Sequence, residues 1–167
     1  RVVQLGCGGA GAATAYAVLA CGAAELRVAD VDDARAERLA DELRRLFPAA
    51  LVEAIRFADI DRSLAEASGV VHATPVGMAH HPGVAFDVGG LRPGTWVSDV
   101  VYRPLETELI RRAAESGLSV LDGGRMAVGQ AYASLEIITG RRPDRARMLR
   151  HFQALAGEER EAAVADD

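Results

Sequence analysis

Four glycines near the amino terminus are spaced as in a loop that holds phosphate groups. Gly6, Gly8 and Gly11 form a G-x-G-x-x-G pattern, with Gly9 and Ala10 inside it. The pattern follows a short apolar run and opens a helical run of small residues, a context that predicts dinucleotide binding. The glycines would allow a tight turn, a close approach to a pyrophosphate and close helix packing, and the helix would offer N–H groups to the phosphates. A glycine-rich turn without a ligand is the alternative.

An acidic residue, Asp30, ends the second apolar run, roughly 20 residues beyond the glycines. A carboxylate there can accept hydrogen bonds from an adenosine ribose diol, whereas a 2′-phosphate would meet like charge. Positions 31 and 32 hold Val31 and Asp32, so neither supplies an arginine that could bind such a phosphate. Asp30 therefore predicts NAD in preference to NADP, and Arg35 is the residue whose reach to a 2′-phosphate would overturn this prediction. Helix capping, the alternative role for Asp30, suits Asp32 or Asp33 better, because each directly precedes a helical run.

The elements that would position these residues alternate along the chain. Apolar runs predict six strands, near residues 2–5, 25–29, 51–56, 70–73, 96–100 and 119–121. Helical patterns lie near residues 10–20, 34–46, 61–67, 105–116, 126–139 and 144–154. Continuous Val, Ile and Leu runs between helices indicate strands buried on both faces. The sequence thus predicts an α/β fold, a doubly wound Rossmann-type domain with a mainly parallel six-stranded sheet and helices on both faces.

Two connections interrupt this rhythm, residues 74–94 and 121–128, and both follow predicted strands. In an open α/β sheet, ligands bind outside the carboxyl ends of the strands, so both segments are expected at the binding edge. We expect one nucleotide-binding domain over residues 1–156 and a flexible tail over 157–167.

Composition excludes several classes of function. The chain has 167 residues and a net charge of −5, without a basic face for nucleic acid. No apolar run approaches the roughly 20 residues that span a membrane. All 19 basic residues are arginines, so lysine is unavailable to any catalytic scheme within this chain.

The cysteines and histidines predict neither a disulfide nor a metal site. Cys7 and Cys21 have no disulfide or metal-site spacing, and we interpret them as small buried residues of a reducing, cytoplasmic compartment. His80 and His81 are adjacent and cannot easily share one metal ion. His72 is expected to be a hydrogen-bonded residue at a strand end.

Four segments resemble a known family when taken together. They are GCGGAGAATAYA from Gly6, ATPVGM from Ala73, DVVYRPLET from Asp99 and LDGGRMAVGQA from Leu121. In this order they resemble the nucleotide-binding domain of shikimate dehydrogenases, and more closely the NAD-using quinate/shikimate dehydrogenases of actinobacteria. The resemblance extends to about residue 154.

The resemblance implies an oxidoreductase that moves a hydride between NAD and the ring alcohol of shikimate or quinate, which are small polyol carboxylates. It also implies an amino-terminal domain with a catalytic lysine–aspartate pair, which this chain lacks. We therefore expect the chain to bind NAD without turnover, as a monomer or homodimer, and to hold no catalytic residue itself. The implied cofactor contacts beyond the glycine loop and Asp30 are Thr74, Pro75, Val100 and Met126, and the implied substrate contacts are Tyr102 and Gln130.

The chain also departs from the family pattern. His72 stands where relatives usually have asparagine, and Arg125 stands where many have glycine. NADP-using relatives carry Asn-Arg-Thr in place of Asp30, Val31 and Asp32, which agrees with the charge argument. Two alternatives stay open: an amino-analogue dehydrogenase of antibiotic biosynthesis, and a non-catalytic dinucleotide-sensing module.

Overall fold

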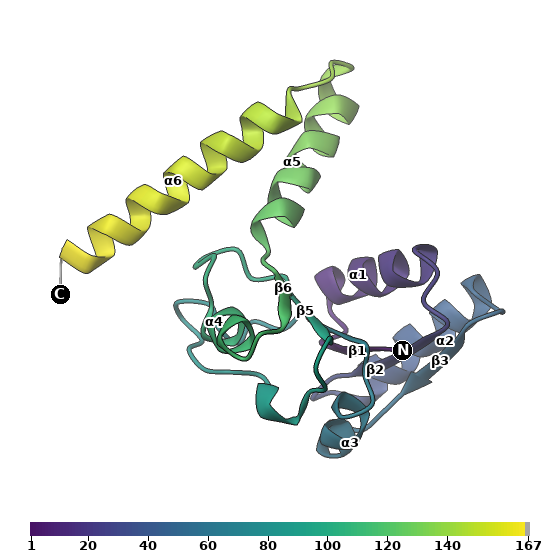
Figure 1. The fold of residues 1–167 in the computed structure, drawn as a ribbon. Helices are drawn as coiled ribbons and strands as arrows, with labels where there is room; N and C mark the ends of the chain where they lie inside the picture. Colours follow the sequence, from purple (N-terminus) through teal and green to yellow (C-terminus); the bar gives the residue numbers. More distant parts are fainter. Residues whose placement is uncertain (166–167) are drawn as a thin grey trace.

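The predicted sheet is confirmed, and all its strands are parallel (Figure 1). The computed structural model describes residues 1–165, with the side chains of residues 1–157. The strands are β1 (Val2–Leu5), β2 (Glu25–Ala29), β3 (Leu51–Ala54), β4 (Gly69–His72), β5 (Trp96–Asp99) and β6 (Ser119–Leu121). Their order is β3-β2-β1-β4-β5-β6. The chain therefore builds outward from β1 in one direction and from β4 in the other, as expected for a doubly wound fold.

Helices cover both faces of the sheet (Figure 1). On one face, α1 (Gly9–Ala20) and α2 (Asp33–Leu46) bury apolar residues such as Leu19 and Leu39 against the first strands. On the other face, α3 (Ile60–Leu64) and α4 (Glu108–Glu115) bury Leu64 and Leu109, together with the loop that contains a short 3₁₀ turn, η2 (Val88–Gly90). A second 3₁₀ turn, η1 (Phe57–Asp59), precedes α3. The apolar side chains packed on the two faces hold the sheet rigid, so the edge at which its strands end is fixed in position.

Three helix boundaries differ by three residues or more from the expected ones, and the first is the end of α3, at Leu64 and not near residue 67. The helix α4 begins at Glu108 and not near residue 105, because the Thr107 side chain caps it by accepting a hydrogen bond from the Ile110 N–H at 3.2 Å. The last helix, α6 (Arg145–Ala165), runs well past residue 154. The segment expected as a tail is rich in Ala and Glu, which favour helix, and it is helical as far as Ala165. Residues 166 and 167 lie outside the described residues.

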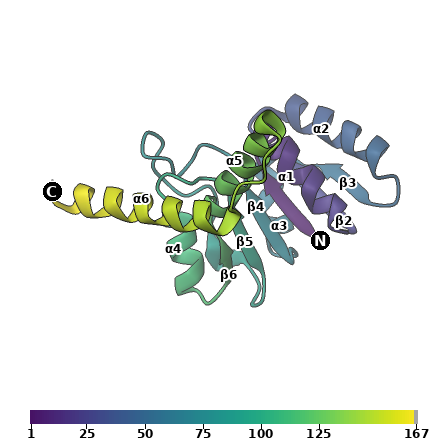
Figure 2. The same cartoon turned by 90° about the horizontal axis from the view of Figure 1, so that it is seen from above.

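The last two helices form a hairpin that projects from the sheet (Figures 1 and 2). Helix α5 (Gly124–Thr139) leads away from the carboxyl edge, and α6 packs against it on the way back. Ile137 and Ile138 on α5 are 83% and 79% exposed. The hairpin therefore presents apolar side chains that the described residues leave uncovered.

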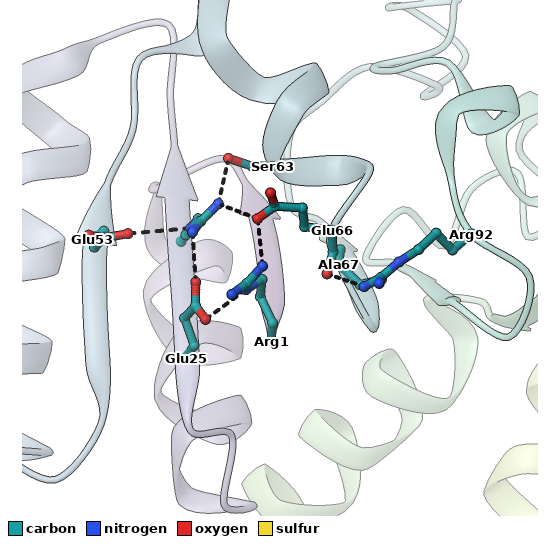
Figure 3. Close-up of polar contacts among 8 residues, drawn as sticks. Arg1, Glu25, Glu53, Ser63, Glu66, Ala67 and Arg92 are labelled. Carbon is teal, nitrogen blue, oxygen red and sulfur yellow. Dashed lines mark hydrogen bonds and ion pairs between the residues drawn. The ribbon is translucent and has the colours of Figure 1, made fainter.

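Charged side chains gather at the opposite, amino edge of the sheet and extend from it to the interior residues Arg27 of β2 and Glu53 of β3 (Figure 3). Arg1 pairs with Glu25 at 2.6 Å and with Glu66 at 2.5 Å. Arg27 pairs with Glu25 at 2.9 Å, with Glu53 at 3.3 Å and with Glu66 at 3.5 Å. These five residues, the amino-edge cluster, join β2, β3 and the segments that precede β1 and β4.

Candidate functional site

A cavity of about 920 Å³ opens at the carboxyl edge, where β1 and β4 lie side by side. Open α/β sheets bind ligands at this point, because the chain leaves the two strands in opposite directions. The volume lies at the upper end of the usual range for small-molecule sites, about 300–1,000 Å³. The predicted site residues that line the cavity are Gly6, Gly8, Gly9, Ala10, Asp30, Thr74, Pro75, Val100, Tyr102, Met126 and Gln130.

The glycines of the loop serve two different purposes. Gly6 has a φ of +95°, and a Cβ there would lie 2.4 Å from the carbonyl oxygen of Ala73. A Cβ on Gly11 would lie 2.1 Å from the carbonyl oxygen of Gly6, so Gly11 serves helix packing, and it does not line the cavity. A Cβ on Gly8 or Gly9 would meet nothing within 4 Å. The protein itself therefore requires Gly6 and Gly11, whereas the space in front of Gly8 and Gly9 is available to a ligand.

Asp30 lies between the cavity and the glycine loop. Its side chain is buried, with 6% exposure, and its oxygens accept hydrogen bonds from the N–H groups of Cys7 at 2.8 Å and Asp32 at 3.0 Å. Arg35 lies beside it, with 3.6 Å between Nη1 and the Asp30 Oδ1. The cap of α2 is Asp32, as expected, because its side chain accepts a hydrogen bond from the Arg35 N–H. Asp30 is thus free of a capping role, and Arg35 is a cavity residue that the motif did not include.

The two cysteines differ. Cys7 is buried in the glycine loop, as expected, and burial raises the pKa of its thiol to about 12, with the nearby Asp30 carboxylate adding to the effect. Cys7 is therefore a packed thiol and not a reactive thiolate at neutral pH. The expectation for Cys21 was wrong: it follows the end of α1 at the surface and is exposed.

A buried polar network lies behind the cavity wall. The His72 ring is 1% exposed, with Nδ1 at 2.9 Å from the Asp99 carboxylate and Nε2 at 2.5 Å from the Thr74 hydroxyl. Asp99 also accepts hydrogen bonds from the Thr107 hydroxyl at 2.7 Å and from the Val101 N–H at 2.9 Å. His72 is thus the hydrogen-bonded strand-end residue that the sequence predicted. It joins the ends of β4 and β5, from which Thr74 and Val101 reach the cavity.

The other end of the cavity is formed by the segments after β5 and β6. Val100 and Met126 are part of its wall, while Tyr102 and Gln130 are exposed at its rim. Arg125 is exposed and is not among the lining residues. Several further residues line the cavity that the sequence analysis did not predict. Most are apolar and carry no feature of a binding residue: Val31, Phe57, Ala73, Val76, Met78, Val84, Ala85 and Val101. The charged residue Arg103 also lines the cavity.

One further residue that sequence reasoning missed is Gln4, on β1. It is fully buried beneath the glycine loop, and its side-chain amide donates hydrogen bonds to the carbonyl oxygens of Gly6 and Gly11. The signal was available, because a glutamine in an otherwise apolar buried strand needs a fixed hydrogen-bond partner.

In the part of the chain that the structure describes, no three His, Cys, Asp or Glu side chains are grouped so that they could hold a metal ion. His80 and His81 are both exposed. None of the helices described is long and apolar enough to cross a membrane.

Comparison with known proteins gives consistent relatives. The chain is 51% identical over 163 residues to "Shikimate dehydrogenase (NADP(+))" of Pseudarthrobacter chlorophenolicus, covering 98% of this chain and 56% of that protein. It is 46% identical over 154 residues to "Quinate/shikimate dehydrogenase (NAD(+))" of Corynebacterium efficiens, covering 92% and 54%. Quinate dehydrogenase from Corynebacterium glutamicum, solved in complex with NAD, superposes with a TM-score of 0.87 at 46% identity, covering 92% and 54%. No protein-family model matches the chain. The chain spans about half the length of the curated relatives it matches.

Proposed function

We propose that this chain, which belongs to the shikimate and quinate dehydrogenase family, is that family's nucleotide-binding domain and binds NAD in the cavity at its carboxyl edge. The observation that carries the proposal is the open space in front of Gly8 and Gly9, between the amino end of α1 and the Asp30 carboxylate. A pyrophosphate suits this space because the missing side chains admit it and the helix end offers N–H groups.

The chain's own residues would bind and orient the dinucleotide. NAD, when bound, supplies a hydride acceptor for oxidising the ring alcohol of shikimate or quinate to a ketone, or the reverse when it is reduced. The glycine loop would hold the phosphates, and Asp30 would accept hydrogen bonds from the adenosine ribose. Val100 and Met126, with Thr74 and Pro75, would enclose the nicotinamide half and exclude water.

NAD is favoured over NADP by the charge at Asp30. The relatives differ in the cofactor that their names give. Those 50–51% identical to this chain are named for NADP(+), and those 46% identical are named for NAD(+). The Asp30 carboxylate is buried and lines the cavity, so a 2′-phosphate beside it would meet like charge in a place that water screens poorly. The guanidinium of Arg35 offsets part of this negative charge. Because it lies 3.6 Å from the Asp30 carboxylate and forms an ion pair with it, we do not expect it to bind a 2′-phosphate.

We propose that the general base comes from a second domain. Oxidising an alcohol requires a base within hydrogen-bond reach of the hydroxyl proton. This chain contains no lysine, and both ring nitrogens of His72 already face hydrogen-bond partners. The exposed Ile137 and Ile138 of α5 give that domain an apolar surface to pack against, and Tyr102 and Gln130 would face the substrate held between the two domains.

Titration calorimetry with NAD and NADP tests the proposal. We expect NAD to bind at least about tenfold more tightly, corresponding to roughly 1.4 kcal/mol. We also expect no NADH from shikimate or quinate with this chain alone. Equal affinity for NADP would contradict the role given to Asp30. Steady turnover by this chain would contradict the second-domain base, and the absence of binding to either dinucleotide would refute the site.

A further inference from the structure

The peptide group between Gly6 and Cys7 is held at both of its ends by buried side chains. On its carbonyl side, Gln4 Nε2 donates to the Gly6 oxygen at 3.0 Å. On its amide side, the Cys7 N–H donates to Asp30 Oδ2 at 2.8 Å. Gln4 is 0% exposed and Asp30 is 6% exposed, so neither bond competes with bulk water. One peptide plane is thus fixed by a side chain on β1 and by one that directly follows β2.

The orientation of the Gln4 amide is determined by its surroundings. Its nitrogen lies within reach of two carbonyl oxygens, those of Gly6 at 3.0 Å and Gly11 at 2.8 Å. Carbonyl oxygens only accept hydrogen bonds, so the NH₂ group must face them. The Gln4 oxygen faces the Thr14 hydroxyl at 2.9 Å, which can donate to it. The side chain therefore joins the glycine turn to the first turn of α1.

This clamp matters because the peptide lies next to glycine. Gly6 has a φ of +95° and no Cβ to restrict it, so the Gly6–Cys7 plane would rotate readily without outside bonds. A rotated plane would turn the Gly6 oxygen toward the Asp30 carboxylate and withdraw the Cys7 N–H from it. The loop would then lose the conformation in which its N–H groups are arranged for phosphate binding.

We propose that Gln4 is a positioning residue for dinucleotide binding, and that Gln4 and Asp30 together preorganise the glycine loop by holding the Gly6–Cys7 peptide. Asp30 then has two tasks, one toward the ribose and one toward the loop. This inference rests on the proposed function, because it assigns the loop to the pyrophosphate. It predicts that the loss of Gln4 weakens the binding of ligands that contain the pyrophosphate and leaves the binding of ligands without it unchanged.

The test replaces Gln4 by Met, which has a similar length but no hydrogen-bond donor. ADP-ribose and adenosine serve as probes, because both carry the ribose diol and only ADP-ribose carries the pyrophosphate. In Gln4→Met we expect the Kd for ADP-ribose to rise about tenfold, because the two buried hydrogen bonds that Gln4 donates to the loop are lost. We expect the Kd for adenosine to stay within about twofold, and hydrogen exchange at the Cys7 amide to accelerate.

Thr14→Val is the matched control. It removes the hydroxyl that faces the Gln4 oxygen and leaves both donated bonds in place, so ADP-ribose binding and Cys7 exchange should match the original chain. Where Gln4→Met does not fold, Gln4→Asn breaks the same bonds with a shorter amide.

Unchanged ADP-ribose binding together with unchanged Cys7 exchange would overturn the inference. Equal weakening of both probes would also overturn it, since that points to a general loss of structure. If the original chain binds neither ADP-ribose nor NAD, the proposed function fails, and Cys7 exchange alone then decides whether the clamp exists.

Discussion

The two edges of the sheet hold their polar groups in different ways. At the carboxyl edge, Gln4, Asp30 and His72 are 0%, 6% and 1% exposed, and each is bonded to neighbouring backbone or side-chain groups. At the amino edge, the side chains of Arg27 and Glu66 are 19% and 44% exposed and form ion pairs within the cluster (Figure 3). Buried polar groups must have fixed partners, and so they define geometry. Partly exposed ion pairs are screened by water and adjust, so they contribute modestly to stability.

This comparison assigns ligand binding to one edge and stability to the other. A substitution at an open, cavity-lining position of the carboxyl edge, such as Gly8 or Gln130, should change affinity with little effect on folding, and one at the amino edge should do the opposite.

Gly8→Val should abolish dinucleotide binding. The protein has room for the side chain, since a Cβ there meets nothing within 4 Å, so the melting temperature should hardly change. The valine would occupy the space proposed for the pyrophosphate, and we expect at least about a hundredfold loss of NAD affinity by calorimetry. Gly90→Val is a matched control, because Gly90 also faces open space but does not line the cavity. Unchanged affinity in Gly8→Val would remove the loop from the site.

The double variant Asp30→Ala, Val31→Arg should reverse the cofactor preference. It removes the repelling carboxylate and adds a cation for the 2′-phosphate, so we expect NADP to bind about tenfold more tightly than NAD. Dissociation constants for both dinucleotides measure this. Arg35→Ala in the original chain is the companion measurement: a large loss of NADP affinity there would show that Arg35 already serves a 2′-phosphate.

Arg27→Met should lower stability and leave binding intact. Arg27 contacts three carboxylates and is 19% exposed, so its loss leaves Glu25, Glu53 and Glu66 close together without their shared cation. We expect a decrease of about 1–2 kcal/mol in the free energy of unfolding, between the values for exposed and buried pairs. Denaturant unfolding measures it. Arg56→Met, whose arginine is 73% exposed and pairs with Asp59, should change stability by less than about 0.5 kcal/mol.

Gln130→Ala divides the carboxyl edge itself into a cofactor end and a substrate end. In a protein that carries both domains, we expect kcat/KM for shikimate or quinate to fall about two- to tenfold. This corresponds to the loss of one hydrogen bond that contributes about 0.5–1.5 kcal/mol. The Kd for NAD should stay the same. A variant that instead loses NAD would move Gln130 to the cofactor.

The smallest effect concerns pH at the amino edge. Burial alone would raise the pKa of Glu25, but its hydrogen bond to Arg1 and the charges of Arg1 and Arg27 outweigh burial and hold the pKa below its ordinary value of 4.5. A lowered pKa in the folded state stabilises the protein above the unfolded pKa, and this contribution is lost as pH falls below about 4.5. In Glu25→Gln, the free energy of unfolding should therefore fall less steeply as the pH is lowered below about 4.5.

Much of the fold followed from local patterns. Apolar runs identified all six strands, but burial on both faces holds at every residue only for β1 and β4, whereas all three residues of β6 are exposed. The glycine pattern and Asp30 identified the first half of the site, since backbone approach and ribose recognition require those residue types at that spacing. The predicted start of α4 and the predicted end of α6 were wrong, because capping by Thr107 and the helical preference of the last residues outweigh weak local signals.

The sequence by itself determined the strands, the glycine loop and the acid beside it, because each depends on residue type and short spacing along the chain. Only the tertiary structure decided which side chains meet. The Cys7 N–H reaches Asp30, and His72 reaches Asp99, because parallel strands and their following loops bring distant residues to one edge. The same packing buries Cys7 and leaves Cys21 exposed. Burial and hydrogen-bond partners depend on how layers pack, and no local pattern carries that information.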